Sequence, residues 1–259
     1  MALNRIYKVV WSKTKGCYVV VSELAKRVGR NKAKAIVISS AAMAMAISPI
    51  LTSTVGAVNT PGTGRDNAVA LGQESKVEDN NGVAIGKKAE STKDSAIALG
   101  FESKSTGNQS VAIGLQTKAT NEQAVAVGST SQATGKKSIA IGNAANASNE
   151  FSVALGSSTE STNKYTTAVG GTAFANQEGA TALGYGARAT AVNAIAIGNS
   201  AKATAKRVLA MGAEASATAD DTIAIGNSST AKKNYDIAFG KEAATRDQGS
   251  GYSVAIGAG

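Results

Sequence analysis

The sequence of 259 residues contains no histidine, one cysteine, one tryptophan and two prolines, and aromatic residues make up 4% of it. Cys17 and Trp11 both lie within the first 57 residues. The remainder therefore lacks the side chains of a thiol nucleophile, a histidine base, a disulfide framework and a Cys/His zinc site. The absence of cysteine also suits passage through an oxidising compartment. We predict a protein that is not an enzyme and that has neither a metal site nor a cofactor.

Large apolar side chains are also scarce, whereas glycine, alanine, serine and threonine are abundant. An ordinary globular core of this length needs more large apolar residues. The chain is therefore either disordered or built on a regular architecture that buries small residues efficiently, and the order in the sequence decides between these two.

The basic character of the chain is confined to its N-terminus. Of the 27 lysines and arginines and the 18 aspartates and glutamates, residues 1–57 hold nine basic residues and one acid, Glu23. Residues 58–259 are left with 18 basic and 17 acidic residues and are nearly neutral. This distribution argues against nucleic-acid binding, which needs a basic surface on the folded domain.

The N-terminal segment is typical of a signal peptide. A basic cluster at residues 27–34 precedes the mostly apolar stretch AIVISSAAMAMAISPIL at 35–51, and Val55-Gly56-Ala57 supplies small residues for a peptidase. A transmembrane helix is the alternative, but three serines and Pro49 make the stretch weak and short for that role. We predict a leader over residues 1–57 that engages the inner-membrane export machinery, cleavage after Ala57, and a short linker over 58–67.

An apolar-Ala-apolar-Gly tetrapeptide recurs through the rest of the chain. Its glycines are spaced 14 residues apart and then, for the last one, 17 residues apart, so three residues are inserted near 246–251. The repeated glycines are Gly72, Gly86, Gly100, Gly114, Gly128, Gly142, Gly156, Gly170, Gly184, Gly198, Gly212, Gly226, Gly240 and Gly257. A fixed period of this length indicates a repeat architecture.

One repeat predicts two short strands and two turns. In Val83-Ala84-Ile85 the alternation gives a strand with two faces, and Gly86 permits a turn with positive φ or a close backbone approach. Small residues three and five positions after the glycine, with a polar residue between them, predict a second strand. Residues 68–259 are therefore predicted to form an all-β solenoid of stacked parallel coils, about 60 Å long at about 4.8 Å per coil.

The alternation also assigns the two faces of the first strand. We expect the larger residues inside the roll, so that Ile141 is buried between Val127 and Leu155. The alanine row is then left for neighbouring chains, with Ala112, Ala126, Ala140 and Ala154 as its central members. Because such a roll has a thin core, we expect a lengthwise homo-oligomer, whose copy number the residues do not give.

Two stretches resemble known families. Residues 4–26, NRIYKVVWSKTKGCYVVVSELAK, closely resemble the extended signal peptides of large Gram-negative autotransporters. The unit [AST]-V-A-I-G-x-x-[AST]-x-[AST] over residues 68–257 resembles the head repeat of YadA-like trimeric autotransporter adhesins. The resemblance implies a left-handed parallel β-roll, a homotrimer, display at the bacterial surface or outer membrane, and attachment to host extracellular matrix or cells. Since the family's neck, stalk and membrane anchor do not follow Gly259, we expect a fragment or truncated gene product.

Other readings rest on weaker motifs. Two segments resemble nucleotide-binding loops but lack the structural context of such loops: Gly184-Tyr185-Gly186 and Thr134–Ser138. Two pairs of residues are better interpreted as exposed turns than as calcium sites: Asp79-Asn80 and Asp220-Asp221.

Two rival functions come from other classes of solenoid protein. A solenoid polysaccharide hydrolase would need paired carboxylates, and no acidic pair recurs in adjacent coils. A structural or ice-binding solenoid stays open, because threonine recurs six residues after the glycine at Thr92, Thr106, Thr120, Thr134 and Thr162.

Overall fold

The computed structural model describes residues 7–12, 17–22, 67–246 and 251–257. The chain divides into two compact units, Met1–Ser48 and Pro49–Gly259. The apolar stretch at 35–51 and the predicted cleavage site after Ala57 lie outside the described residues. Within the described part of the chain, no helix has the length and apolar character needed to cross a membrane.

The first unit contains a hairpin that the sequence analysis did not predict. Strands β1 (Tyr7–Ser12) and β2 (Cys17–Ser22) pair antiparallel, from Tyr7 opposite Ser22 to Ser12 opposite Cys17. Both strands are rich in valine and carry tyrosine or tryptophan, residues that favour strands. The leader therefore contains an element with its own strand propensity.

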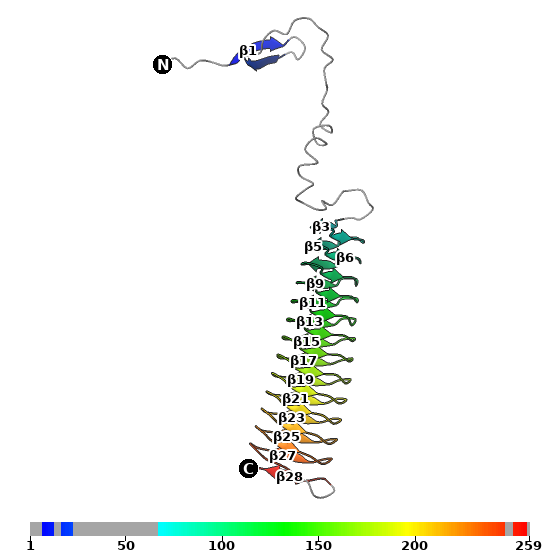
Figure 1. The fold of residues 1–259 in the computed structure, drawn as a ribbon, viewed down its shortest axis with the longest axis vertical. Helices are drawn as coiled ribbons and strands as arrows, with labels where there is room; N and C mark the ends of the chain where they lie inside the picture. Colours follow the sequence, from blue (N-terminus) through cyan, green and yellow to red (C-terminus); the bar gives the residue numbers. More distant parts are fainter. Residues whose placement is uncertain (1–6, 13–16, 23–66, 247–250, 258–259) are drawn as a thin grey trace, which may run out of the picture. The chain divides into compact units, whose positions relative to one another are not determined.

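The second unit is a parallel β-solenoid, as predicted (Figure 1). Each 14-residue coil contributes a three-residue strand to a 14-stranded sheet, and most coils also contribute a two-residue strand to a 12-stranded sheet. Equivalent residues of successive coils pair directly, so that Ala126 lies between Ala112 and Ala140. The repeat period in the sequence is thus the coil period in the structure.

The strands of the larger sheet are β3 (Val69–Leu71), β5 (Val83–Ile85), β7 (Ile97–Leu99), β9 (Val111–Ile113), β11 (Val125–Val127), β13 (Ile139–Ile141), β15 (Val153–Leu155), β17 (Thr167–Val169), β19 (Thr181–Leu183), β21 (Ile195–Ile197), β23 (Leu209–Met211), β25 (Ile223–Ile225), β27 (Ile237–Phe239) and β28 (Val254–Ile256). Those of the smaller sheet are β4 (Lys76–Val77), β6 (Glu90–Ser91), β8 (Lys104–Ser105), β10 (Lys118–Ala119), β12 (Gln132–Ala133), β14 (Asn146–Ala147), β16 (Glu160–Ser161), β18 (Phe174–Ala175), β20 (Arg188–Ala189), β22 (Lys202–Ala203), β24 (Ser216–Ala217) and β26 (Thr230–Ala231).

The turns explain the repeated glycine. Gly142 has φ +138°, and a Cβ atom there would collide with the carbonyl group of Gly156 in the next coil. Each coil therefore needs a residue without a side chain where its backbone stacks closely on its neighbour. The left-handed positions elsewhere in the turns carry other residues, such as Ala144 at φ 53° and Phe151 at φ 55°.

The predicted inward and outward faces are reversed in the structure. Ala112, Ala126, Ala140 and Ala154 are 0% exposed within a single chain, so they line the interior of the roll and cannot form an oligomer face. Ile141, which was expected to be buried, is 42% exposed. Its strand neighbours are Val127 and Leu155, as expected, but this apolar row points outward.

The width of the roll causes this reversal. Four inward rows converge in each coil: the strand alanine, the residues three and five positions after the glycine, and the residue before the next strand. Val208 is the largest side chain among those with less than 2% exposure. Since the interior is almost filled by methyl-sized and hydroxyl side chains, rows of isoleucine and leucine do not fit inside and must face outward.

Buried hydroxyl groups in this interior are hydrogen-bonded, as buried polar groups must be. The hydroxyl oxygens of Ser105 and Ser110 lie 2.6 Å apart, and Thr117 donates to the carbonyl of Gly128 over 2.5 Å. Serine and threonine can therefore replace alanine in the inward rows without leaving an unpaired polar group.

The last coil departs from the repeat. Asp236 occupies an inward row and is 0% exposed, and its carboxylate accepts backbone N–H groups from Lys233 and Ser253 over 3.1 and 2.9 Å. Beside it, the rings of Tyr235 and Tyr252 stack with centroids 4.8 Å apart. These contacts join Tyr235 and Asp236 to the residues that follow the predicted insertion. Residues 247–250 of that insertion lie outside the described residues.

Candidate functional site

The outward side of the 14-stranded sheet is an apolar face. It consists of the residues on either side of each buried strand alanine, mainly valine, isoleucine and leucine, and these side chains are exposed or half-buried in the single chain. Soluble monomers rarely expose a continuous apolar surface of this extent. The face is therefore a candidate interaction surface along the length of the roll.

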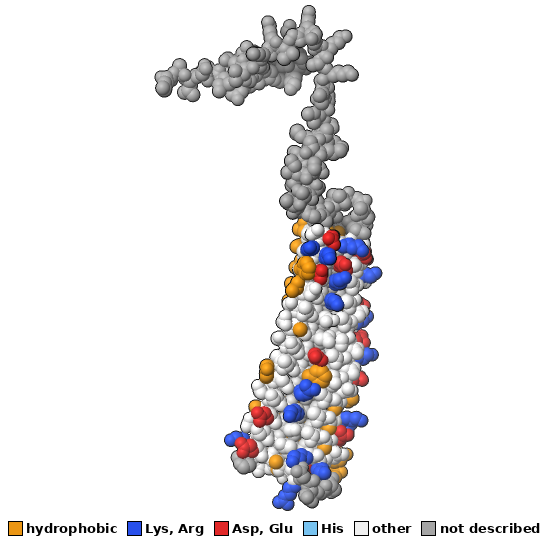
Figure 2. Space-filling model, viewed as in Figure 1, with side chains coloured by type: hydrophobic (Ala, Val, Ile, Leu, Met, Phe, Trp, Pro, Cys, Tyr) orange, Lys and Arg blue, Asp and Glu red, His pale blue; other side chains and the backbone are white. Residues whose placement is uncertain are grey.

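The outward side of the 12-stranded sheet is polar and carries a groove. Near the N-terminal end of the roll, the groove has a volume of about 560 Å³ and is lined by Lys88, Glu90, Glu102, Lys104, Gln116, Lys118, Thr130 and Gln132. Lysine and acidic side chains lie together at this end (Figure 2).

Ion pairs and hydrogen bonds between coils order this groove. The Lys104 Nζ lies 3.0 Å from the Glu90 Oε2, and the Gln116 amide Nε2 donates a hydrogen bond to the Glu102 Oε2 over 2.9 Å. Each links residues one coil apart, so these contacts hold successive coils in register and arrange charges of both signs along the groove. Such a surface offers hydrogen bonds and charge complementarity to a polar partner.

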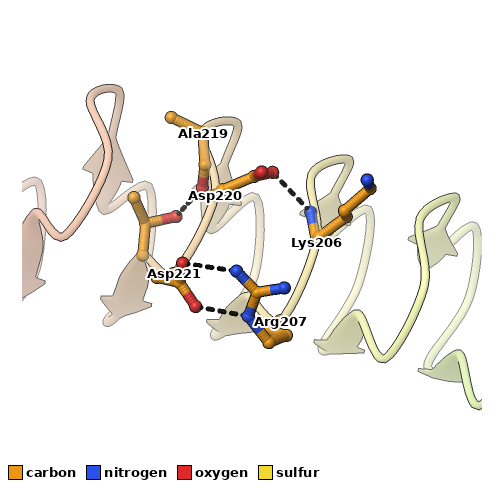
Figure 3. Close-up of polar contacts among 6 residues, drawn as sticks. Lys206, Arg207, Ala219, Asp220 and Asp221 are labelled. Carbon is orange, nitrogen blue, oxygen red and sulfur yellow. Dashed lines mark hydrogen bonds and ion pairs between the residues drawn. The ribbon is translucent and has the colours of Figure 1, made fainter.

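A second group of charges lies at the turns of two adjacent coils further along the roll (Figure 3). Arg207 donates two hydrogen bonds to Asp221, over 2.6 and 2.7 Å, and the backbone N–H of Lys206 donates to Asp220 over 2.9 Å. The hydrogen bond from Arg207 lowers the pKa of Asp221 and raises that of Arg207. The Asp220-Asp221 pair is thus held by one neighbouring coil and does not form a shared carboxylate site.

The weaker motifs lie in ordinary turns and strands. Gly184-Tyr185-Gly186 forms the turn after β19, and Thr134–Ser138 forms the turn before β13. Asp79 accepts the N–H of Asn80 over 2.9 Å within its own turn. Across the described residues, no three cysteine or acidic side chains gather closely enough to hold a metal ion.

Threonines of the predicted column stack in successive coils. Thr106 and Thr120 are half-buried, and the hydroxyl of Thr106 donates to the carbonyl of Thr120 over 3.5 Å. The adjacent outward row holds Lys104, Lys118 and Gln132. The column is therefore single, with charged and amide side chains beside it.

Two further columns were missed by the sequence analysis. We call the entry column the residues two positions before each three-residue strand, and the exit column the residues two positions after it. In the entry column Phe151 and Tyr165 stack with centroids 5.5 Å apart, and the Lys137 ammonium lies 5.4 Å from the Phe151 ring centre. The 14-residue spacing of positions 137, 151 and 165 was the available signal.

Comparison with protein families gives two matches. Residues 4–51 match the extended signal peptide of the type V secretion system. The YadA head domain repeat matches at 66–89, 91–117, 105–131, 119–143, 133–159, 161–187, 189–215 and 217–243. No curated protein matches the chain.

Proposed function

Because this chain belongs to the family of YadA head domains, non-enzymatic adhesin heads exported to the bacterial surface by type V secretion, we propose that residues 68–259 attach the bacterium to host extracellular matrix or host cells as a homotrimer. In this proposal residues 1–57 direct the chain through the inner-membrane export machinery and are then removed. The three rolls lie side by side, with the left-handed winding of the family.

The single observation that carries the proposal is the continuous apolar face. It runs over 14 paired strands, about 60 Å at the spacing of parallel coils. Packing this face around a common axis would bury it in every copy at once, because rotation brings the same surface of each chain to the axis. The copy number of three rests on family membership.

This arrangement leaves the opposite side of each roll for attachment. The 12-stranded sheet with its groove would point away from the axis, so three copies of the Lys104 and Lys118 surface would be displayed together. Repetition of one weak site on a trimer raises the overall affinity for a polymeric matrix, since the second binding event is intramolecular. A polar, charge-ordered groove suits a polar partner better than an apolar one.

A binding assay with the exported, processed chain tests the proposal. The protein is added to immobilised matrix proteins and to cultured host cells, and sedimentation measures its oligomeric state. Lys104→Glu with Lys118→Glu should weaken attachment about tenfold by reversing the charge of the groove. Lys202→Glu, in the same outward row but away from the groove, is the matched control.

Attachment to neither matrix nor cells would count against the adhesive role. Equal losses from the groove variant and from Lys202→Glu would place the contact elsewhere on the roll. Inhibition of ice growth by a chain that does not attach would favour the ice-binding alternative.

A further inference from the structure

The apolar face is bordered on both sides by turn residues. For β17 (Thr167–Val169), the entry column supplies Tyr165 on one side and the exit column supplies Gly171 on the other. The turns project on both sides of the stacked strands (Figure 1). Any partner that covers the apolar face therefore also approaches these two columns.

Aromatic side chains in the columns are ordered but exposed. Tyr165 is 56% exposed, Phe151 is 39% exposed and Tyr185, in the exit column, is 64% exposed. Phe151 and Tyr165 are nearly parallel, with an interplanar angle of 8°. Aromatic residues of this kind are enriched in protein interfaces, and few occur elsewhere in the repeats.

Rotational symmetry determines which columns meet. When parallel copies are arranged around a common axis that runs along the rolls, the entry column of each copy faces the exit column of the next. Equivalent residues of the copies then lie at equal height along that axis. An entry residue then lies between the exit residues eight positions before and six positions after it in the sequence. With about 4.8 Å per coil, both are within about 3 Å along the axis.

Side-chain sizes in the middle of the roll are complementary under this pairing. Phe151 would face Asn143 and Ser157, and Tyr165 would face Ser157 and Gly171, all of them smaller.

One coil further, the pattern reverses. The entry column has Gly179, and the exit column has Gly171 and the large Tyr185. Tyr185 leans back over Gly171 within its own chain, since a Cβ at Gly171 would lie 3.2 Å from the Tyr185 ring.

We propose, on the basis of the trimer proposed above, that these columns form an aromatic lock between copies of this chain. Tyr165, supported by Phe151, packs beside Gly171 of the next copy, against the edge of the Tyr185 ring that leans over that glycine. Tyr185 of that copy occupies the space beside Gly179. Displacing one copy by a coil would bring Tyr165 fully against Tyr185, so the lock fixes the axial register and favours identical partners.

Engineered cysteines test the lock, because the processed chain contains no cysteine of its own. The processed chain carrying Tyr165→Cys and Gly171→Cys is oxidised and examined on a non-reducing gel. Within one chain the two positions are separated by β17, a span of more than about 10 Å, which exceeds the reach of a disulfide. A covalently closed trimer is therefore expected, and only from bonds between copies.

Two controls separate the lock from the trimer. Each single cysteine should give no closed trimer, and neither should Tyr165→Cys combined with Asn199→Cys, two coils further along the exit column. A trimer in sedimentation without a 165–171 cross-link would overturn the lock and leave the proposed trimer standing. Equal cross-linking to position 199 would overturn the register, and a monomer in sedimentation would overturn both proposals.

Discussion

Replacing Ala140 and Ile141 separately by glutamate should give two different defects, because the neighbouring residues face opposite ways. Ala140 is 0% exposed within one chain, and Ile141 is 42% exposed. A carboxylate at 140 is forced into the roll interior, where the desolvation of one ion costs several kcal/mol and the extra volume adds about 1–3 kcal/mol. The sum approaches the total stability of a domain, which is about 5–15 kcal/mol.

The same substitution at Ile141 should act on assembly of the proposed trimer. A fully buried isoleucine contributes about 1.5–3 kcal/mol, so the exposed 42% leaves about 1 kcal/mol for each copy to gain on association. Three copies lose about 3 kcal/mol, which is about a hundredfold in the dissociation constant of the trimer before any charge repulsion. The roll interior is unchanged by this substitution.

Circular dichroism melting at several protein concentrations distinguishes the two defects. Ile141→Glu should melt early at low concentration and recover as the concentration rises, since mass action restores the assembly. Ala140→Glu should melt early at every concentration. Lys136→Gln, in an exposed turn, should melt like the parent chain. Concentration-dependent rescue of Ala140→Glu, or none for Ile141→Glu, would refute the assignment of the two faces.

Three further outcomes are expected. N-terminal sequencing of the exported chain should begin at Val58, and a product that retains the leader would contradict the signal peptide. Gly142→Ala should lower stability in thermal melting by more than the about 1–3 kcal/mol of backbone strain at φ +138°, because its Cβ would also collide with the carbonyl group of Gly156. Ala144→Gly, at a left-handed position, should be tolerated. Burial alone would raise the pKa of Asp236, but hydrogen bonds from Thr245 and the N–H groups of Ser253, Lys233 and Lys232 lower it. The ionised Asp236 carboxylate therefore stabilises the fold at pH values above its unfolded pKa of about 4. This stabilisation is lost as the pH falls through the lower pKa of the folded state. Asp236→Ala should remove that part of the acid dependence of melting.

Much of the repeat could be read from residues alone because its constraints are local. A glycine every 14 residues and the Val83-Ala84-Ile85 alternation identify a strand followed by a tight turn, whatever surrounds them. The extended leader could be recognised for the same reason, since its motif is contiguous. The hairpin of β1 and β2 was not predicted, because a contiguous leader motif identifies an export signal and not its secondary structure.

The candidate surfaces were harder to predict because they join residues that are distant in sequence. The groove combines side chains from four coils, and the aromatic stack joins Phe151 and Tyr165 across one coil. A column of this kind is visible in sequence only after the coil period is applied to the variable positions. The period is plain for glycine, alanine and threonine, which recur in most repeats, whereas the aromatic residues occur in only a few of them.

The amino-acid sequence is enough to predict stacked parallel coils, because period and alternation follow from backbone geometry within one coil. It could not decide which side of each strand is inside, since alternation separates two faces and does not orient them. That choice depends on the distance between the two sheets, a tertiary quantity. The roll is so narrow that alanine fills it, and the larger residue, Ile141 in the central coil, is therefore turned outward.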